Sequence, residues 1–491
     1  MQPRFNLVDE PWLPAAGHGL VSLHDIFARP ELPALGGSVT EKIAITKLLQ
    51  AIAQAACTPK DDEEWQRLGE EGMAHRCIEY LDRWHDAFWL YHPDKPFLQF
   101  PAVAKAAIKP YGALMPEIAT GNTSIVFHSQ VPPEPQQVSD DARARLLLVH
   151  MSCCFSGKKV DSSVVLSPGW EKSKSAKPGP ALCSLGLLHS FLQGRSVRQT
   201  IWLNLLTLED VRQNAVWTGG IGTPPWVHMP AGENDAIAQA LQRSLIGRLV
   251  PMARFLLLGE KGVHYVEGIQ HPDYLHGAMM DPSAAGDFSK AKPKMLWADP
   301  DKRPWRSLTA LLGFLTASTA SPVTCPQLKW CAARLCRADI GAFRLWSGGI
   351  RLSRNAGEQY LTGSDDAVES ELDLHTSHLN GETSIWFTQL QHAMSVLEQM
   401  SKTLYACTLG YYKDACVDNA ADLAAQATQE FWQLAERHFP RLSNACAETE
   451  NAPRHAIMQR IRQCAQQSYA HACPQDTARQ LQIFVKHQPR L

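Results

Sequence analysis

The distribution of proline and glycine along the chain constrains its fold more than any other feature of the sequence. From about residue 5 to residue 373, prolines, glycines and short apolar runs alternate, whereas from about residue 383 to residue 487 both are rare and Ala, Gln and Leu dominate. The second texture is typical of long helices. Because an acidic stretch from Asp365 to Asp373 separates the two, we expect two domains, 1–377 and 378–491.

Breaks in the second segment divide it into about four helices. They fall near Gly410–Tyr412, near Pro440–Asn451 and at Pro474. Helices joined by such short loops are typical of an antiparallel bundle. We therefore predict an α+β fold class, in which a large irregular mixed α/β domain precedes a C-terminal four-helix bundle.

The end of the predicted bundle is basic. Residues 451–491 carry a local charge of +5, because a single acid, Asp476, stands against six basic residues. These are Arg454, Arg460, Arg462, Arg479, Lys486 and Arg490. Two interpretations remain open: a solvated helical face, or a surface that contacts a nucleic-acid backbone, for which we select Arg460 and Arg462.

The first segment contains both helical and strand patterns. Apolar positions in Glu41–Ala56 form one broad helical face, and Asp62–Tyr91 also favours a helix. Arg254–Leu258 and Val263–Glu267 flank the turn Gly259–Gly262, which is typical of a β-hairpin.

Composition excludes several classes of protein. With 47 Lys+Arg against 49 Asp+Glu, the formal charge is -2, so any charge-driven function must be local. The longest apolar run, around Leu146–Val149, is far too short to span a bilayer. The first 13 residues include prolines and acids rather than the apolar core of a signal peptide, so we expect a cytoplasmic protein.

Cysteine usage favours reduced thiols. The 13 cysteines are an odd number without a repeating spacing, and no CxxC is present. We expect neither a disulfide framework nor a zinc site, and interpret Cys325, Cys331 and Cys336 as small residues rather than metal ligands.

The sequence lacks the common signatures of catalysis. It has no phosphate-binding glycine loop, no dinucleotide fingerprint, no nucleophile elbow and no HExxH. The pairs His24-Asp25 and His85-Asp86 are similar to those of metal phosphohydrolases, but structural or surface roles are favoured because no further ligands form a recognisable arrangement. We expect a protein that is not an enzyme and holds no metal or other cofactor, with a divergent metal nuclease as the less favoured alternative.

Four segments, taken together, are specific. FNLVDEPWLP at 5–14, VSLHDIF at 21–27, HPDKPFLQ at 92–99 and SGGIRLSRNAGEQYLTGSDDAVES at 347–370 occur in this order. The sequence thereby resembles CasA, the family of the large subunit of the type I-E CRISPR Cascade complex, over essentially its whole length.

The resemblance implies a non-catalytic subunit with several partners. Members hold the 5′ handle of the guide RNA, read the protospacer-adjacent motif of duplex target DNA, open the duplex for R-loop formation and help to recruit a helicase-nuclease. They also contact other Cascade subunits, including the backbone subunits and the small-subunit dimer. A purely structural assembly subunit of a ribonucleoprotein is the alternative.

The resemblance assigns the loop 123–137 to the guide handle. Phe127 and its neighbour His128 are its candidate contacts, since an aromatic ring on an exposed, Pro-rich loop can stack on a base. The alternative is that Phe127 belongs to the core, as part of an apolar run.

The resemblance assigns two lysine-bearing segments to motif recognition. Gly157, Lys158 and Lys159 lie in the first, and Lys290 and Lys294 in the second. In an extended strand, Lys290, Lys292 and Lys294 would share one side. Solvated surface lysines are the alternative in both segments.

The last segment, 351–360, resembles the hairpin in which the family carries a wedge. Gln359 is the residue that aligns with the wedge, with Glu358 and Tyr360 as alternatives. Arg351 and Arg354 are candidate contacts to the DNA backbone. An ordinary surface hairpin is the alternative interpretation.

Overall fold

Contacts in the computed structural model divide the chain into two compact units. The mixed unit comprises Met1–Phe314 and Ala320–Leu374, and the helical unit comprises Leu315–Thr319 and His375–Leu491. The described residues are 2–114, 138–154, 161, 163–167, 181–183, 186–214, 216–271, 281–289, 294–315, 323–338, 340–351, 367–379 and 385–491. The boundary that we expected after residue 377 falls within the short 3-10 helix η8 (Thr376–Leu379), on the helical side of this division.

The mixed unit contains ten α-helices within the described residues. They are α1 (Leu23–Ala28), α2 (Val39–Cys57), α3 (Asp62–Arg83), α4 (Asp140–Cys153), α5 (Val197–Leu203), α6 (Leu208–Gln213), α7 (Ala236–Leu241), α8 (Leu245–Leu249), α9 (Leu308–Leu311) and α10 (Pro326–Arg337). Helix α2 begins at a capping box, in which Ser38 Oγ accepts from the backbone of Glu41 and the Glu41 carboxylate accepts from the backbone of Ser38. Most of its residues are buried, so α2 is a core helix of this unit, as its broad apolar face predicted.

The predicted helix Asp62–Tyr91 is too long. Helix α3 ends at Arg83 and is followed by a 3-10 helix, η1 (His85–Phe88), and strand β4 (Trp89–Tyr91). Strand β4 pairs antiparallel with β1 (Arg4–Asn6). This partner is distant in sequence, so local helical periodicity could not reveal where the helix ends.

The strands of the mixed unit form five small sheets among the described residues, in the orders β1-β4, β2-β3, β5-β8-β7, β10-β9-β11 and β13-β12-β6. Their bounds are β2 (Leu13–Ala15), β3 (Gly19–Val21), β5 (Ile108–Lys109), β6 (His189–Gln193), β7 (Arg254–Leu258), β8 (Val263–Glu267), β9 (Gly286–Asp287), β10 (Lys294–Met295), β11 (Val323–Thr324), β12 (Ala342–Ile350) and β13 (Ala367–His375). The predicted hairpin is confirmed as β7 and β8, with Gly259 donating to the carbonyl of Gly262.

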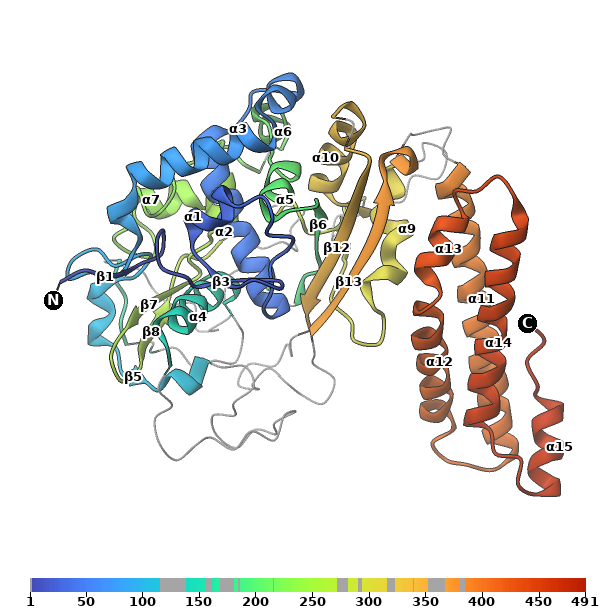
Figure 1. Cartoon of the computed structure of the whole chain (residues 1–491). Helices are drawn as coiled ribbons and strands as arrows, with labels where there is room; N and C mark the ends of the chain where they lie inside the picture. The colour runs from blue at the N-terminus through green and yellow to red at the C-terminus, as the bar shows by residue number, and fades with distance from the viewer. Residues whose placement is uncertain are drawn as a thin grey trace. The chain divides into compact units, whose positions relative to one another are not determined.

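The acidic stretch Asp365–Asp373, which we expect to separate the two domains, lies largely within strand β13. In β13, Val368, Leu372 and Leu374 are buried and alternate with the acids. Alternation with period two is the pattern of a half-buried strand. Strand β13 lies beside β12 (Figure 1), so the stretch belongs to the sheet of the mixed unit.

The helical unit confirms the predicted C-terminal bundle. Three long helices, α11 (Ile385–Asp414), α12 (Ala420–Glu436) and α14 (Asn451–Ala472), run side by side, as Figure 1 shows. Two short helices, α13 (Phe439–Ala445) and α15 (Ala478–Lys486), complete the unit. The buried apolar residues of the described ranges therefore fall into two groups, one within the mixed unit and one within the helical unit.

The predicted break near Gly410–Tyr412 is wrong, because α11 continues through it to Asp414. A Cβ at Gly410 would lie 2.5 Å from Nδ1 of His487. The glycine therefore permits close approach of the chain that follows α15, and the helix is not interrupted. The predicted break at Pro474 is confirmed between α14 and α15.

No helix within the described ranges is long and apolar enough to cross a membrane.

Candidate nucleic-acid interface

The described residues include only part of the predicted site. Lys294, Arg351, Arg460 and Arg462 are described. Ten predicted residues lie outside the described ranges: Phe127, His128, Gly157, Lys158, Lys159, Lys290, Arg354, Glu358, Gln359 and Tyr360. The described ends of the segments that carry them show where on the mixed unit each segment begins and returns.

Described residues that flank 115–137 on both sides contact the turn of the β7–β8 hairpin. At one end, Tyr111 in the 3-10 helix η3 (Tyr111–Leu114) donates its hydroxyl to the carbonyl of Gly259, at 2.7 Å. At the other end, Arg143 in α4 donates Nη2 to the carbonyl of Glu260, at 3.3 Å. The hairpin turn therefore contacts the described chain before and after the segment that we predict to contact the guide handle.

Aromatic and charged side chains next to the same segment also contact one another. The Arg143 guanidinium lies 4.7 Å from the centre of the Tyr111 ring, and its Nη1 donates to the Tyr91 hydroxyl at 3.1 Å. That hydroxyl donates to Asp140 at 2.7 Å. Burial raises the pKa of Tyr91 to about 12, so the phenol remains a neutral donor at physiological pH.

The described residues on either side of 155–160 contact the sheet β5-β8-β7. Before it, Cys154 adopts a left-handed backbone conformation with φ 49° and donates its thiol to the carbonyl of Ala253. After it, Asp161 donates its backbone N–H to the carbonyl of Tyr265 in β8, and its carboxylate accepts from the backbone of Ala107. Hydrogen bonds from Ser163 and Ala107 lower the pKa of Asp161 to about 2. Described residues next to both predicted segments therefore contact the same sheet or its hairpin turn.

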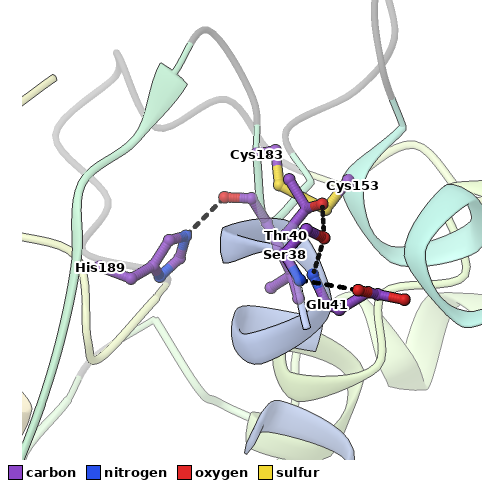
Figure 2. Close-up of a disulfide and its surroundings, with 7 residues drawn as sticks. Ser38, Thr40, Glu41, Cys153, Cys183 and His189 are labelled. Atoms are coloured by element: carbon purple, nitrogen blue, oxygen red, sulfur yellow. Dashed lines mark hydrogen bonds between the residues drawn. A yellow bond between two sulfur atoms is a disulfide. The ribbon is translucent and has the colours of Figure 1, made fainter. Parts of the chain in front are cut away.

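The end of α4 is also joined to the region that precedes β6. Cys153 and Cys183 form a disulfide, with their Cα atoms 4.6 Å apart (Figure 2). Leu182 donates its backbone N–H to the carbonyl of Ser152 at 2.9 Å and accepts from Nε2 of His189 at 2.6 Å. Burial lowers the pKa of His189, so its ring is neutral and Nε2 carries the proton.

The disulfide departs from the expectation that cysteine usage favours reduced thiols. Cys153 and Cys183 are paired, and the other eleven cysteines are not in disulfides. Their spacing of 30 residues gives no signature, and the backbone hydrogen bond between their neighbours, Leu182 and Ser152, is what places them within reach. The tertiary structure alone therefore reveals the pair.

The third and fourth segments come together beside β6. Strand β10 begins at the exposed Lys294, opposite Asp287 of β9, and Ala298 soon afterwards donates its backbone to Gly186. The end of β12 lies against the same chain, because a Cβ at Gly349 would be 2.5 Å from the carbonyl oxygen of Leu187 and 3.0 Å from Cβ of Ala298. A glycine is thus required where the end of β12 packs against Leu187 and Ala298, just before the segment that is predicted to carry the wedge.

Arg351, the first residue after β12, has acidic neighbours that the sequence analysis missed. Its Nη1 lies 3.5 Å from Asp299 and 4.0 Å from Asp301. Asp299 and Asp301 come within seven residues after Lys294, and this reversal of charge is a signal in the sequence.

The basic end of the helical unit is partly neutralised. Asp414, which lies outside the window 451–491, forms an ion pair with Lys486 at 2.6 Å and accepts a bond from Arg479 through its carbonyl. Arg454 bonds to Gln389 and Asn451. Arg460 and Arg462 are exposed on α14, on either side of the buried Ile461. Successive residues of a helix are about 100° apart around its axis. The two arginines therefore lie at opposite edges of the exposed face and do not point in the same direction.

The histidine-aspartate pairs have structural contacts. Asp25 forms a capping box with Ser22 at the start of α1. His85 places Nε2 2.7 Å from the carboxylate of Asp9. Within the described ranges, no group of three or more His, Cys, Asp or Glu residues is arranged to hold a metal ion.

This architecture defines a class of two-part proteins in which a mixed α/β unit precedes a helical bundle. The crystal structure of Cse1 from Thermobifida fusca matches the chain with a TM-score of 0.76 at 20% identity, covering 99% of this chain and 97% of that one. A chain from a CRISPR RNA-guided surveillance complex matches with a TM-score of 0.69 at 15% identity, covering 99% of both chains. The predicted fold class is confirmed.

Sequence comparison identifies the family within this class. The family model of CRISPR-associated protein Cse1 matches residues 6–468. The CRISPR-associated protein CasA/Cse1 of Thermus thermophilus is 30% identical over 226 residues, which are 44% of this chain and 42% of that protein. The chain therefore belongs to the Cse1 family, also named CasA, and the resemblance stated from the sequence is confirmed.

Proposed function

We propose that this chain is the non-catalytic large subunit of an RNA-guided DNA-surveillance complex. In this role it recognises the protospacer-adjacent motif in duplex DNA, promotes duplex opening and R-loop formation, and helps to recruit a helicase-nuclease. The family match over residues 6–468 is the observation that carries the proposal. A solved relative, similar over 99% of its chain, belongs to an assembly described as a CRISPR RNA-guided surveillance complex.

The arrangement of the described segment ends supports a division of labour within the mixed unit. Described residues that flank 115–137 and 155–160 contact the sheet β5-β8-β7 or its hairpin turn, while Lys294 and Arg351 lie on chain that packs beside the start of β6. Phe127 and His128 are then the proposed contacts to the guide handle. Guide pairing reads the target sequence, whereas the protein reads only the adjacent motif and starts strand separation.

The motif contacts must be local because the whole chain carries a formal charge of only -2. We assign the motif contacts to Gly157, Lys158, Lys159, Lys290 and Lys294. Lys294 is exposed where β10 begins, so its ammonium is accessible to a groove edge or a phosphate. In the wedge segment, Gln359 is the proposed wedge, with Glu358 and Tyr360 as alternatives.

The DNA-backbone contacts are assigned to both units. Arg351 and Arg354 flank the start of the wedge segment, and Arg460 and Arg462 lie on α14. In this proposal the helical unit docks on the small-subunit dimer and helps to keep the displaced strand separate. Phosphate contacts of this kind position DNA without reading its sequence.

Reconstitution tests the proposal. The guide RNA and the other subunits are assembled with and without this chain, and binding to duplexes with and without the motif is measured over a range of salt concentrations. We expect the chain to confer a preference for the motif-bearing duplex and a salt-dependent affinity. Normal assembly without any effect on duplex binding would instead establish a structural assembly subunit.

The non-catalytic assignment has a separate test. The purified chain is incubated with duplex and single-stranded DNA in the presence of Mg²⁺, Mn²⁺ or Zn²⁺. We expect no cleavage. Metal-dependent cleavage that is lost in His85→Ala would support the metal nuclease instead.

A further inference from the structure

Arg351 lies between two carboxylates of the same unit. Its Nη1 is 3.5 Å from Oδ1 of Asp299 and 4.0 Å from Oδ2 of Asp301. The three side chains are 39%, 45% and 73% exposed, respectively. At these distances and exposures, water reaches the charges and the attraction contributes little to folding stability.

The fold nevertheless holds the two partners in place. Asp301 donates its backbone N–H to the carboxylate of Asp299 at 3.1 Å, and Lys302 donates its backbone N–H to the carbonyl of Asp299 at 3.0 Å, which fixes a tight turn. Arg351 follows Gly349, whose missing Cβ lets β12 pack against Ala298, the residue before Asp299. Backbone packing, rather than chance contact of long side chains, therefore sets the pair.

A guanidinium at this position without acidic neighbours would attract any duplex. Arg–phosphate contacts are independent of sequence and supply most of the non-specific affinity of a DNA-binding protein. A genome offers a very large excess of sites that lack the motif, so each such contact keeps more of the complex on the wrong DNA. A carboxylate beside the guanidinium offsets its positive charge and so reduces this non-specific affinity for DNA.

We infer that Asp299 and Asp301 hold the place of a DNA phosphate on Arg351, an autoinhibitory contact that weakens binding to duplex of any sequence. On DNA, a phosphate replaces the carboxylates at the guanidinium. The complex then dissociates quickly from DNA that lacks the motif, and long-lived binding depends on the motif-reading residues. This inference rests on the proposed function, because it takes Arg351 as a contact to the DNA backbone.

The test uses the complete guide-bearing complex and a duplex without the motif. Four variants of this chain are compared: D299N/D301N, R351Q, the triple variant that combines them, and the control D82N. Asp82 is an exposed carboxylate on α3, so D82N removes a charge from the same unit at another surface. The dissociation constant and the dissociation rate are measured at several salt concentrations.

We expect D299N/D301N to tighten binding by about threefold, the size expected for release of an exposed ion pair, and D82N to leave it unchanged. In the R351Q background, the same two substitutions should have no effect, because the guanidinium that they release is gone. Equal tightening with and without Arg351 would show simple repulsion of DNA by the carboxylates and overturn the inference. No tightening in either background would also overturn it.

The same measurements distinguish a failure of the proposed function from a failure of this inference. If the parent complex does not prefer motif-bearing duplex, the proposed function fails whatever the variants do. If the parent shows that preference and the variants behave as the parent, only the autoinhibitory contact is refuted.

Discussion

The ammonium of Lys47 and the carboxylate of Asp281 form an ion pair inside the mixed unit, with Nζ 2.6 Å from Oδ1 and neither side chain exposed. Asp281 also accepts from Ser283, and Arg248 lies near enough to add positive charge. Burial alone would raise the pKa of Asp281, but the charges of Lys47 and Arg248 hold it below its usual value. The pair therefore joins α2 to the chain between β8 and β9 in the ionised form.

Removal of one partner should be costly. We expect Lys47→Ala to destabilise the mixed unit by about 3–5 kcal/mol, because it leaves the Asp281 carboxylate buried without its main counter-charge. The double variant Lys47→Met, Asp281→Leu should recover much of that loss, since no buried charge remains. Thermal melts of the full chain measure both. Arg29→Ala, in an exposed pair with Glu31, is the control and should leave the melting temperature unchanged; equal shifts for Lys47→Ala and this control would contradict the prediction.

Because two buried histidines have lowered pKa values, we expect the folding stability of the chain to fall as the pH decreases. Burial, followed by the charge of Arg248, lowers the pKa of His271 to about 3, and burial also lowers the pKa of His189. In the unfolded chain a histidine has a pKa of about 6.5, so between roughly pH 6.5 and pH 3 the unfolded state binds more protons and the native state loses stability. The slope should approach about 1.4 kcal/mol per pH unit for each such histidine.

The matched variant is His271→Gln, which retains a donor for the carbonyl of Pro251 and cannot titrate. Its melting temperature should decrease less steeply than that of the parent as the pH is lowered below 6.5. An exposed control, His75→Gln on α3, should keep the parent slope. Parallel profiles for His271→Gln and the parent would contradict the assignment.

Lysines near β10 are predicted to read the adjacent motif. Lys290→Ala and Lys294→Ala, and also Lys158→Ala, should weaken binding of motif-bearing duplex by about 1–3 kcal/mol if the lysine contacts a base edge. Assembly on the guide RNA should be normal. Binding is compared at matched salt with Lys329→Ala, an exposed lysine of α10. If Lys290→Ala and Lys158→Ala both bind like the parent, these segments do not read the motif.

Phe127 is predicted to stack on a base of the guide handle. Phe127→Ala should loosen the chain from the guide-bearing complex, since stacking contributes about 1–3 kcal/mol per base. Its melting temperature should change little. Phe255→Ala provides the contrast, because Phe255 in β7 is fully buried and its truncation should cost about 3–5 kcal/mol of folding stability. A large fall in the melting temperature of Phe127→Ala, with normal assembly, would place Phe127 in the core.

Gln359 is predicted to act when the duplex opens, after first contact. Gln359→Ala should slow R-loop formation on fully paired targets. The base pair next to the motif must then unstack without a side chain that takes the place of its lost stacking partner. A target already open over its first base pairs should restore the rate. Equal losses on both targets would make Gln359 a motif reader, and no loss on either would make the hairpin structural. Glu358→Ala and Tyr360→Ala, measured in parallel, decide among the three alternatives.

Local patterns predicted those parts of the fold that depend on neighbouring residues. The helix at α2 follows from apolar spacing and a Ser-x-x-Glu cap, and the β7–β8 hairpin follows from a glycine-bounded turn between apolar strands. Strand β13 carries the same kind of local signal, because its buried apolar residues alternate with acids that indicate a polar segment when they are read alone.

The two-unit organisation, the family and the order of the four segments can be predicted from the amino-acid sequence, since they depend on composition and on short runs of residues. Folding is needed to bring Cys153 to Cys183, Lys47 to Asp281 and Arg351 to Asp299. Residues 30, 234 and 52 positions apart come together through the packing of strands and helices around them. Such long-range contacts leave no periodic signal in the chain, so the electrostatic setting of the candidate interface emerges only on folding.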